Sequence, residues 1–307
     1  MGSEKTSTLD EILEAYERYQ KHVHGLRPRT IQGYQFMTRK FIRATLGEDP
    51  IDVSRLRPAD IVSYITSIRN RYRPSTIRLI GTAMRSFFRY LQVEGFCDMR
   101  LEAAIPTIAI WRFASIPCYL SDTEYSRLME SLGAPTLCGR RNRAIILCLA
   151  TLGLRPGEVA DLCLEDIDWR IGTLHLKTRK TRRGSILPLP SQPGLAIVEY
   201  LHEERPQTNA RQIFVRHSGN RKGEPITAGI VTGTVIRALK KVKIEAPIAG
   251  AYVLRHTAAT RMVRRGARLK EVADVLGHQN LDTTTIYAKV DLAALRDVAL
   301  PWPEVTS

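Results

Sequence analysis

The chain has few cysteines, and neither its cysteines nor its histidines have the spacing of a metal site. Five cysteines occur among its 307 residues, none in a Cys-x-x-Cys pair, and seven histidines occur without a His-Glu-x-x-His arrangement. A disulfide framework or a zinc cluster is therefore not expected, and a reducing cytoplasm suits this composition. A Gly-x-x-x-x-Gly-Lys-Ser/Thr nucleotide loop is also missing, so we expect neither a metal nor another cofactor.

Long apolar runs and acidic side chains are scarce as well. No stretch approaches the about 18 apolar residues of a membrane span, and the first residues lack the apolar core of a signal peptide. We therefore expect no membrane partner and a cytoplasmic, nucleoid-associated location in a bacterium. Only 31 Asp and Glu oppose 46 Lys and Arg, which leaves a formal net charge of +15. Such an excess indicates a polyanionic partner such as double-stranded DNA.

The first hundred residues have the apolar periodicity of a helical domain. Proline at the first turn and glycine after the last turn mark several of the helix ends. The pattern predicts four helices, over residues 9–24, 28–46, 58–69 and 74–93. On the fourth helix, arginines lie on a face without acids, which favours a phosphate contact over an ordinary solvated face. The candidate DNA-binding residues of this half are Arg27, Arg29, Arg39, Lys40, Arg43, Arg78, Arg85 and Arg89.

The second half begins after a break in the helical pattern. Pro106, Trp111 and Pro117 indicate a linker over residues 101–117. We therefore predict two domains. Residues 1–100 form a helical DNA-binding domain, and residues 118–307 contain the catalytic residues and a C-terminal tail.

The second domain mixes helices with a short stretch of period two. Helices are predicted from the capping-box sequence Ser121–Glu124 onward and over residues 138–152, 158–164, 191–205, 227–243, 253–265 and 269–276. Residues 173–176 and 186–189 predict two strands joined by a very basic hairpin. Lys177, Arg179 and Arg182 in this hairpin are further candidate DNA-binding residues. The expected fold class is mainly α with a small antiparallel β-sheet.

The most specific signal for chemistry lies near the C-terminus. His278 precedes Tyr287 by nine residues, and Asp282 is predicted to cap the short helix that holds this tyrosine. A tyrosine is a weak nucleophile, but cations that bind a phosphate can hold it in line with the phosphorus atom. Guanidinium groups suit this task because they bind phosphate oxygens in a bidentate fork. Arg155 and Arg255 are the candidates, so the sequence predicts DNA cleavage through a phosphotyrosyl intermediate.

Several segments in this order resemble the tyrosine recombinase family, which includes the phage integrases and Xer-like proteins. They are Thr151–Glu158, Val253–Thr260, Leu276–His278 and Tyr287. The resemblance covers roughly residues 117–295, and the N-terminal half is compatible with the family's helical core-binding domain. It implies a two-domain architecture, with that core-binding domain followed by an α+β catalytic domain.

The resemblance also implies roles for the matching residues. Arg155 and Arg255 resemble the family's phosphate clamp, and His278 resembles the histidine that hydrogen-bonds the scissile phosphate. Tyr287 matches the nucleophile that becomes joined to the 3′ phosphate and frees a 5′ hydroxyl. Glu158 matches an acidic position that helps to hold the site together.

Three assignments depend on local detail. Lys180, eight residues before the proline of the second strand, is our choice for the family's general acid, with Lys177 as the alternative. Tyr252 stands where most relatives have histidine, and its phenol is neutral and a poor base near neutral pH. His256 follows Arg255 on a helix, so it is expected to point away from the site and to make a structural hydrogen bond.

The predicted function is site-specific DNA recombination, for a mobile element or phage. The resemblance implies a homotetramer on DNA that exchanges strands through a Holliday junction. We expect DNA sites with inverted repeats and a protein that is monomeric when free. The tail over residues 290–300 is expected to dock on a neighbouring protomer or on its own domain. One alternative is a catalytically impaired, sequence-specific DNA-binding regulator of the same fold, in which Tyr252 marks the decay. A type IB topoisomerase is another, which the short two-domain form and the Leu-Gly-His sequence disfavour.

Overall fold

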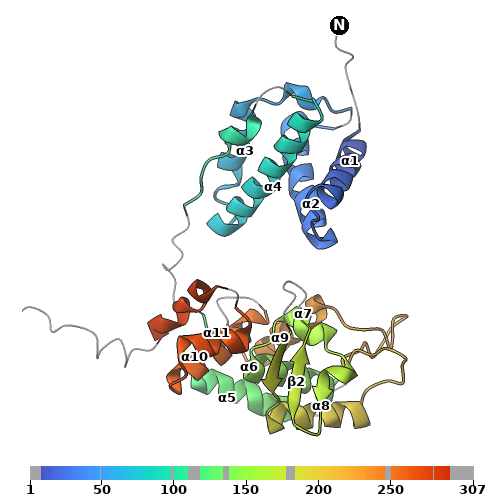
Figure 1. Cartoon of the computed structure of the whole chain (residues 1–307), viewed down its shortest axis with the longest axis vertical. Coiled ribbons are helices and arrows are strands. Elements are labelled where there is room, and N and C mark those ends of the chain that lie inside the picture. Colours follow the sequence, from blue (N-terminus) through green and yellow to red (C-terminus); the bar gives the residue numbers. More distant parts are fainter. Residues whose placement is uncertain are drawn as a thin grey trace, which may run out of the picture. The chain divides into compact units, whose positions relative to one another are not determined.

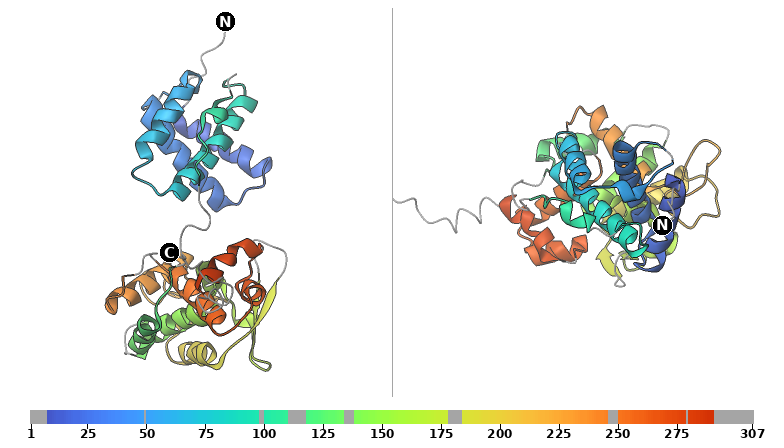
Figure 2. Two further views of the ribbon diagram at one scale, coloured as in Figure 1. Left: turned by 90° about the vertical axis from the view of Figure 1, so that its left-hand side faces the viewer. Right: turned by 90° about the horizontal axis from the view of Figure 1, so that it is seen from above.

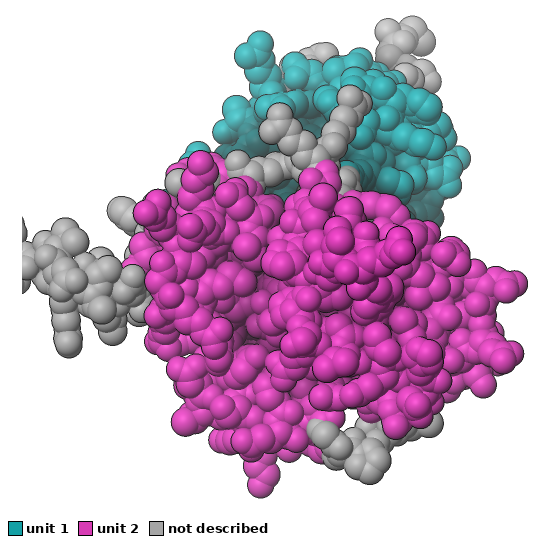
Figure 3. Space-filling view, turned by 60° about the horizontal axis from the view of Figure 1, so that its bottom comes forward, with its two compact units in different colours: residues 1–112 teal, residues 113–307 magenta. Residues whose placement is uncertain are grey.

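The computed structural model describes residues 8–48, 50–97, 100–109, 118–133, 138–177, 184–245, 250–278 and 280–290. The chain divides into two compact units, residues 1–112 and residues 113–307, which are coloured separately in Figure 3. Within the described residues, no helix is both long enough and apolar enough to cross a membrane.

The first unit is a bundle of four α-helices, as the sequence predicted. They are α1 (Leu9–His22), α2 (Pro28–Leu46), α3 (Pro58–Ile68) and α4 (Pro74–Val93), with a 3₁₀ turn η1 at Val53–Arg55 (Figure 1). Proline occupies the first turn of three of them, where its missing N–H is not needed. Aromatic side chains fill the core, because Tyr16, Phe41, Phe87 and Phe88 are almost completely buried and pack edge to face.

The predicted start of the linker at residue 101 is wrong. Residues Leu101–Ala104 form a 3₁₀ turn, η2, and both Leu101 and Ile105 are buried in the core of the first unit. The guanidinium of Arg85 also donates to the Ile105 carbonyl at 3.1 Å. Pro106 breaks the helical pattern, but residues 101–105 before it still bury apolar side chains and therefore belong to the first unit.

The second unit combines helices with one small sheet (Figures 1 and 2). Its helical elements are α5 (Asp122–Glu130), η3 (Ser131–Gly133), α6 (Gly139–Leu152), α7 (Pro156–Asp161), η4 (Leu164–Asp166), α8 (Ser191–Glu203), α9 (Ala228–Lys241), α10 (Tyr252–Arg264), α11 (Leu269–Leu276), η5 (Leu281–Thr283) and η6 (Thr285–Val290). The central helix α6 is buried along most of its length and packs against α8 and α10. The predicted class, mainly α with a small antiparallel sheet, is confirmed.

The sheet contains one strand more than the sequence predicted. Its order is β1 (Ile167–Asp168), β2 (Thr173–Leu176) and β3 (Ser185–Pro188), with both pairs antiparallel. Leu174 faces Leu187 across the β2–β3 pair, and both side chains are buried. β1 escaped prediction because two residues are too short to display a period of two.

Two glycines bring the ends of α6 and α11 together. Gly153 ends α6 at φ +64° and Gly277 ends α11 at φ +60°, a backbone region that favours glycine. At Gly153 a Cβ atom would lie only 2.6 Å from Cδ2 of Leu276. Glycine is therefore required here for conformation and for space, and this close approach sets the position of the site described next.

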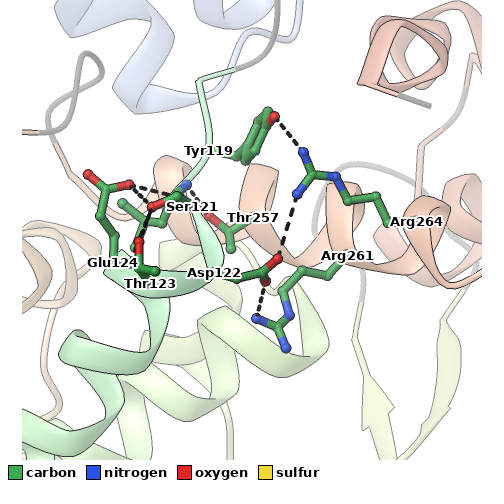
Figure 4. Close-up of polar contacts among 9 residues, drawn as sticks. Tyr119, Ser121, Asp122, Thr123, Glu124, Thr257, Arg261 and Arg264 are labelled. Atoms are coloured by element: carbon green, nitrogen blue, oxygen red, sulfur yellow. Dashed lines mark hydrogen bonds and ion pairs between the residues drawn. The ribbon is translucent and has the colours of Figure 1, made fainter. Parts of the chain in front are cut away.

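The start of α5 fixes helix α10 (Figure 4). The predicted capping box Ser121–Glu124 is present at the first turn of α5. Next to it, the Leu120 amide donates to the buried Thr257 hydroxyl at 2.9 Å, and the Arg261 guanidinium donates to Asp122 at 3.0 Å (Figure 4). These contacts hold α10, which carries Arg255, in one orientation.

Candidate active site

Arg155 is held by an acidic residue three positions later. It precedes α7, and Glu158 accepts from its main-chain N–H at 2.7 Å and from its Nη1 at 2.6 Å. Its Nη2 donates to the Gly277 carbonyl at 3.1 Å. The side chain is 37% exposed, so a guanidinium of fixed orientation remains accessible to an anion.

Arg255 is buried and joins the two helix ends. It is 5% exposed, its Nη1 donates to the Gly153 carbonyl at 2.6 Å, and its Nη2 donates to the Leu276 carbonyl at 2.6 Å. Burial and, to a smaller degree, the charge of Arg155 lower its pKa to about 10. Arg255 therefore stays charged at neutral pH.

His278 follows α11 and is held by a threonine. Its Nδ1 lies 2.7 Å from the hydroxyl of Thr284, which is fully buried. Burial, followed by the charges of Arg255 and Arg155, lowers the pKa of His278 to about 4. The ring is therefore neutral at pH 7. In the tautomer that accepts from Thr284, Nε2 carries the proton and serves as a donor.

Tyr287 lies on η6 with its ring buried and its hydroxyl hydrogen-bonded. The side chain is 1% exposed and packs in a cluster with Val263, Val272 and Leu276. Its hydroxyl is 2.8 Å from Nδ1 of His256. Burial raises the pKa of Tyr287 to about 12, although the charge of Arg255 acts in the opposite direction. The phenol is therefore protonated at neutral pH in this conformation.

Two expectations near Tyr287 are wrong. His256 was expected to point away from the site, but it points to the Tyr287 hydroxyl, because the side of α10 that carries it packs against η6. Asp282 was expected to cap the helix of Tyr287, but it lies inside η5, and Asn280 accepts from the Asp282 amide at 2.8 Å instead. Thr284 was not singled out, since nothing in a run of three threonines indicates which one is buried against a histidine.

Arg155, Arg255, His278 and Tyr287, which are four of the predicted residues of the second unit, come together in one cluster. The charges of Arg155 and Arg255 lower the pKa of His278, and the charges of Tyr287 and Tyr252 act on the pKa of Arg255. Tyr252, the first residue of α10, is 50% exposed. The structure thus assembles two guanidinium groups, a neutral imidazole and a phenol at the meeting point of α6, α10 and α11.

Of the candidate hairpin residues Lys177, Arg179, Lys180 and Arg182, only Lys177 lies within the described part of the chain. Its Nζ is 2.7 Å from Oδ1 of the buried Asp166, and this partner raises the pKa of Lys177. Lys180, Arg179 and Arg182 lie outside the described residues, as does most of the predicted docking tail over residues 290–300.

The candidate DNA-binding residues of the first unit fall into two groups. Those that are exposed on α2, on α4 or just before α2 are Arg27, Arg29, Lys40, Arg43, Arg78 and Arg89. Arg39 instead pairs with Asp10 at 2.6 Å, and Arg85 donates to the Ile105 carbonyl. Asp10 lies on α1, so the sequence pattern of α2 alone does not indicate this pairing. No group of three or more potential metal ligands is found among the described residues.

The chain matches the phage integrase family over residues 119–293. It is 38% identical over 298 residues to "Putative integrase/recombinase y4rA" of Sinorhizobium fredii, a match that covers 97% of this chain and 72% of the relative. It is 29% identical over 296 residues to tyrosine recombinase XerC of Halalkalibacterium halodurans, with 94% and 96% covered.

Solved structures with the same fold include two complexes with DNA. The XerH site-specific recombinase bound to a palindromic difH substrate, a post-cleavage complex, has a TM-score of 0.72 at 18% identity over 94% of this chain and 83% of that one. A lambda integrase tetramer bound to a Holliday junction has a TM-score of 0.68 at 20% identity, with 89% and 79% covered. Together with the sequence matches, the fold shows that this chain belongs to the phage integrase family of tyrosine recombinases.

Proposed function

We propose that this chain is a site-specific DNA recombinase in which Tyr287 attacks a phosphodiester of duplex DNA. The oxygen of Tyr287 becomes joined to the 3′ phosphate, a 5′ hydroxyl is freed, and a second 5′ hydroxyl later reverses the reaction. The observation that carries this proposal is the convergence of Arg155, Arg255 and His278 beside Tyr287. Residues far apart in the sequence supply the cations and the nucleophile that in-line phosphoryl transfer needs.

The electrostatics of the cluster fit a phosphate that gains charge in its transition state. Arg155 is accessible and oriented by Glu158, and Arg255 is fixed by two carbonyls in a buried setting where its charge is poorly screened. His278 is neutral, and its Nε2 can donate one further hydrogen bond without adding charge. Each such donor typically contributes on the order of 10²–10³ in rate.

The hydroxyl of Tyr287 must become accessible to a phosphate before it reacts. Its side chain is 1% exposed, but its hydroxyl end contacts a histidine rather than the apolar cluster. The segment that carries it consists of two short 3₁₀ turns, a form of helix with poorer hydrogen-bond geometry than the α-helix. We propose that DNA binding rearranges residues 280–290 locally and brings the Tyr287 hydroxyl within reach of a phosphate held by the arginines, while this hydroxyl stays beside Nδ1 of His256.

The proton for the leaving 5′ oxygen is proposed to come from the basic hairpin. Lys180 is the proposed general acid, and the pairing of the alternative, Lys177, with Asp166 supports that choice. The test is to compare Lys180→Ala and Lys177→Ala in single-turnover cleavage. We expect only the first variant to lose on the order of 10²-fold or more in rate.

DNA is proposed to lie against both units. The domain over residues 1–100 would bind duplex through the exposed arginines and lysine of α2 and α4, and the hairpin residues Lys177, Arg179 and Arg182 would add contacts. The tetramer that lambda integrase forms on a Holliday junction supports a similar assembly here. We further propose that the sites carry inverted repeats and that the free protein is a monomer.

A second candidate is a DNA-binding regulator without catalytic activity. Two points favour it: Tyr252 stands where the resemblance to the family implies a histidine, and Tyr287 is buried in this conformation. This regulator would bind a specific site tightly and leave the DNA intact. A topoisomerase, by contrast, would relax any supercoiled plasmid regardless of its sequence.

The deciding experiment uses a nicked suicide duplex that carries the site selected by the full chain from a random-sequence duplex library. The recombinase predicts a covalent protein–DNA adduct that is absent in Tyr287→Phe. Tyr200→Phe is the matched control, because Tyr200 is also fully buried with its hydroxyl beside a histidine. Specific binding without an adduct supports the regulator, and relaxation of unrelated plasmids supports the topoisomerase.

A further inference from the structure

We infer that His256 is the group that takes the phenolic proton of Tyr287 when the DNA strand is cut. The inference rests on the proposed function and assigns a proton acceptor to it. Tyr252, the first residue of α10, is 50% exposed and is a phenol like Tyr287 itself. The proton that Tyr287 loses on attack therefore needs a different acceptor.

The geometry favours His256 over the other members of the cluster. Its Nδ1 lies 2.8 Å from the Tyr287 hydroxyl, which is hydrogen-bonding distance, and the two rings are tilted by 51°. His278 uses its Nδ1 for Thr284. Glu158 is engaged with both the main chain and the side chain of Arg155. Among the described residues of the cluster, His256 is the base that already touches the reacting oxygen.

The protonation states are those that a proton acceptor needs. Burial and the charge of Arg255 lower the pKa of His256, so its ring is neutral near pH 7 and Nδ1 can accept. The phenol of Tyr287 remains protonated in the resting protein. The proton moves only as the new O–P bond forms, because bonding to phosphorus removes the basicity of the phenolic oxygen.

Substrate binding strengthens this base. The titratable and charged groups beside His256 are Arg255 on the same helix, His278 beyond α11 and Tyr287 on η6. Since Arg255 lowers the pKa of His256, a phosphate anion bound to Arg155 and Arg255 offsets that charge and raises the pKa again. His256 is thereby a weak base in the free protein and a stronger one when DNA is bound.

The step balances without a cofactor. The Tyr287 oxygen forms a bond to phosphorus, the bond from phosphorus to the 5′ oxygen breaks, and the phenolic proton passes to Nδ1 of His256. The leaving 5′ oxygen takes a proton from the general acid, proposed above as Lys180. In rejoining, the imidazolium of His256 returns its proton to Tyr287.

The test compares His256→Asn with wild type in cleavage of the nicked suicide duplex. Asparagine keeps an oxygen acceptor close to the position of Nδ1 but cannot take a proton. We expect its cleavage rate near neutral pH to fall by about 10²-fold or more, with duplex affinity unchanged. The wild-type cleavage rate should fall at acidic pH as His256 becomes protonated; this decrease is the acidic limb of the pH–rate profile. The variant should lack the acidic limb, and its cleavage rate should increase as the pH rises.

A second histidine–tyrosine pair supplies the matched control. Nε2 of His217 lies 3.3 Å from the buried Tyr200 hydroxyl, the rings are stacked, and burial lowers the pKa of His217 too. His217→Gln therefore removes a comparable, partly buried histidine away from the cluster. We expect this variant to cleave at the wild-type rate and to keep the acidic limb.

A duplex with a bridging sulfur in place of the 5′ oxygen separates the two proton transfers. A thiolate leaves without a proton, because a thiol has a pKa of only about 8.5. This substrate should restore cleavage in Lys180→Ala and should not restore it in His256→Asn. Restoration in His256→Asn overturns the inference, because His256 would then serve the leaving group.

Two further results overturn the inference while leaving the proposed function intact. One is a His256→Asn rate equal to that of wild type with the same pH dependence. The other is a faster rate, which would mean that His256 only restrains Tyr287. Absence of an adduct with wild-type protein contradicts the proposed function itself, and the inference with it.

Discussion

Glu158 holds Arg155 at two points, with Oε2 2.7 Å from its main-chain nitrogen and Oε1 2.6 Å from its Nη1. The same carboxylate therefore caps the first turn of α7 and orients a guanidinium of the proposed phosphate clamp. The pair is partly exposed, with the two side chains 37% and 21% accessible. Its contribution to the free energy of unfolding is therefore small, and its main effect is to orient the Arg155 guanidinium.

Glu158→Gln should lower the cleavage rate more than it lowers stability. The amide oxygen still accepts from the main chain, but Arg155 is no longer oriented by a charged partner. We expect about a tenfold lower rate and a decrease in the free energy of unfolding of less than about 1 kcal/mol. Glu224→Gln is the control, because Glu224 also pairs with an arginine three residues away, Arg221 at 2.5 Å. An equal decrease of rate in both variants would argue against a special role for Glu158.

Arg255→Lys and Arg155→Lys should separate folding from catalysis. Both remove a bidentate donor, so we expect the cleavage rate of both to fall by on the order of 10² or more. Arg255→Lys should also lower the free energy of unfolding by about 1–3 kcal/mol, because two buried carbonyls then lack a partner. Arg155→Lys should change it little. Denaturant unfolding of both proteins measures the difference, and equal destabilisation would contradict the hydrogen bonds from Arg255 to Gly153 and Leu276.

The sequence predicts those elements of the fold whose ends are determined by residues close together in the chain. Both ends of helix α11 could be predicted, because Gly277 stops it and its apolar positions repeat with a helical period. The proline starts of α2 and α4 were equally visible. The two-residue strand β1 and the buried turn at Leu101 were not, since each depends on packing against residues distant in the sequence.

The same distinction holds within the site. The resemblance to the family implies that Glu158 supports the site, and the structure contains its contact with Arg155. The contact between His256 and Tyr287 spans 31 residues and depends on how η6 packs on α10. No period or spacing indicates it, and the resemblance to a family directs attention to position 252 instead.

Stability of the second unit should depend on pH through His278. Its pKa is about 4 in the folded protein, below the ordinary histidine value of 6.5, so the unfolded chain binds more protons between these values. The stabilisation is therefore complete above pH 6.5 and disappears as the pH falls towards 4. His278→Gln should flatten this dependence, and a change at the exposed His202 should not. Hydrogen exchange of α11 against pH measures it, and an unchanged slope in His278→Gln would contradict the burial of this ring.

The basic residues of the first unit should differ in their effect on DNA binding. Arg78→Ala with Arg89→Ala removes two exposed cations. We expect the slope of log affinity against log salt to become shallower by about 1 for each phosphate that is no longer neutralised. Arg85→Ala should instead destabilise the first unit, since Arg85 holds the Ile105 carbonyl. Binding titrations with duplex DNA at several salt concentrations measure this slope. An unchanged slope in the double variant would mean that the face of α4 with Arg78 and Arg89 does not contact DNA.

The most direct test of the central claim is the chemical identity of the protein–DNA link. The covalent complex formed on the nicked suicide duplex is digested, and mass spectrometry locates the nucleotide on the peptide. We predict a 3′-phosphoryl nucleotide on the oxygen of Tyr287. A link to any other residue, or one through a 5′ phosphate, would contradict the account.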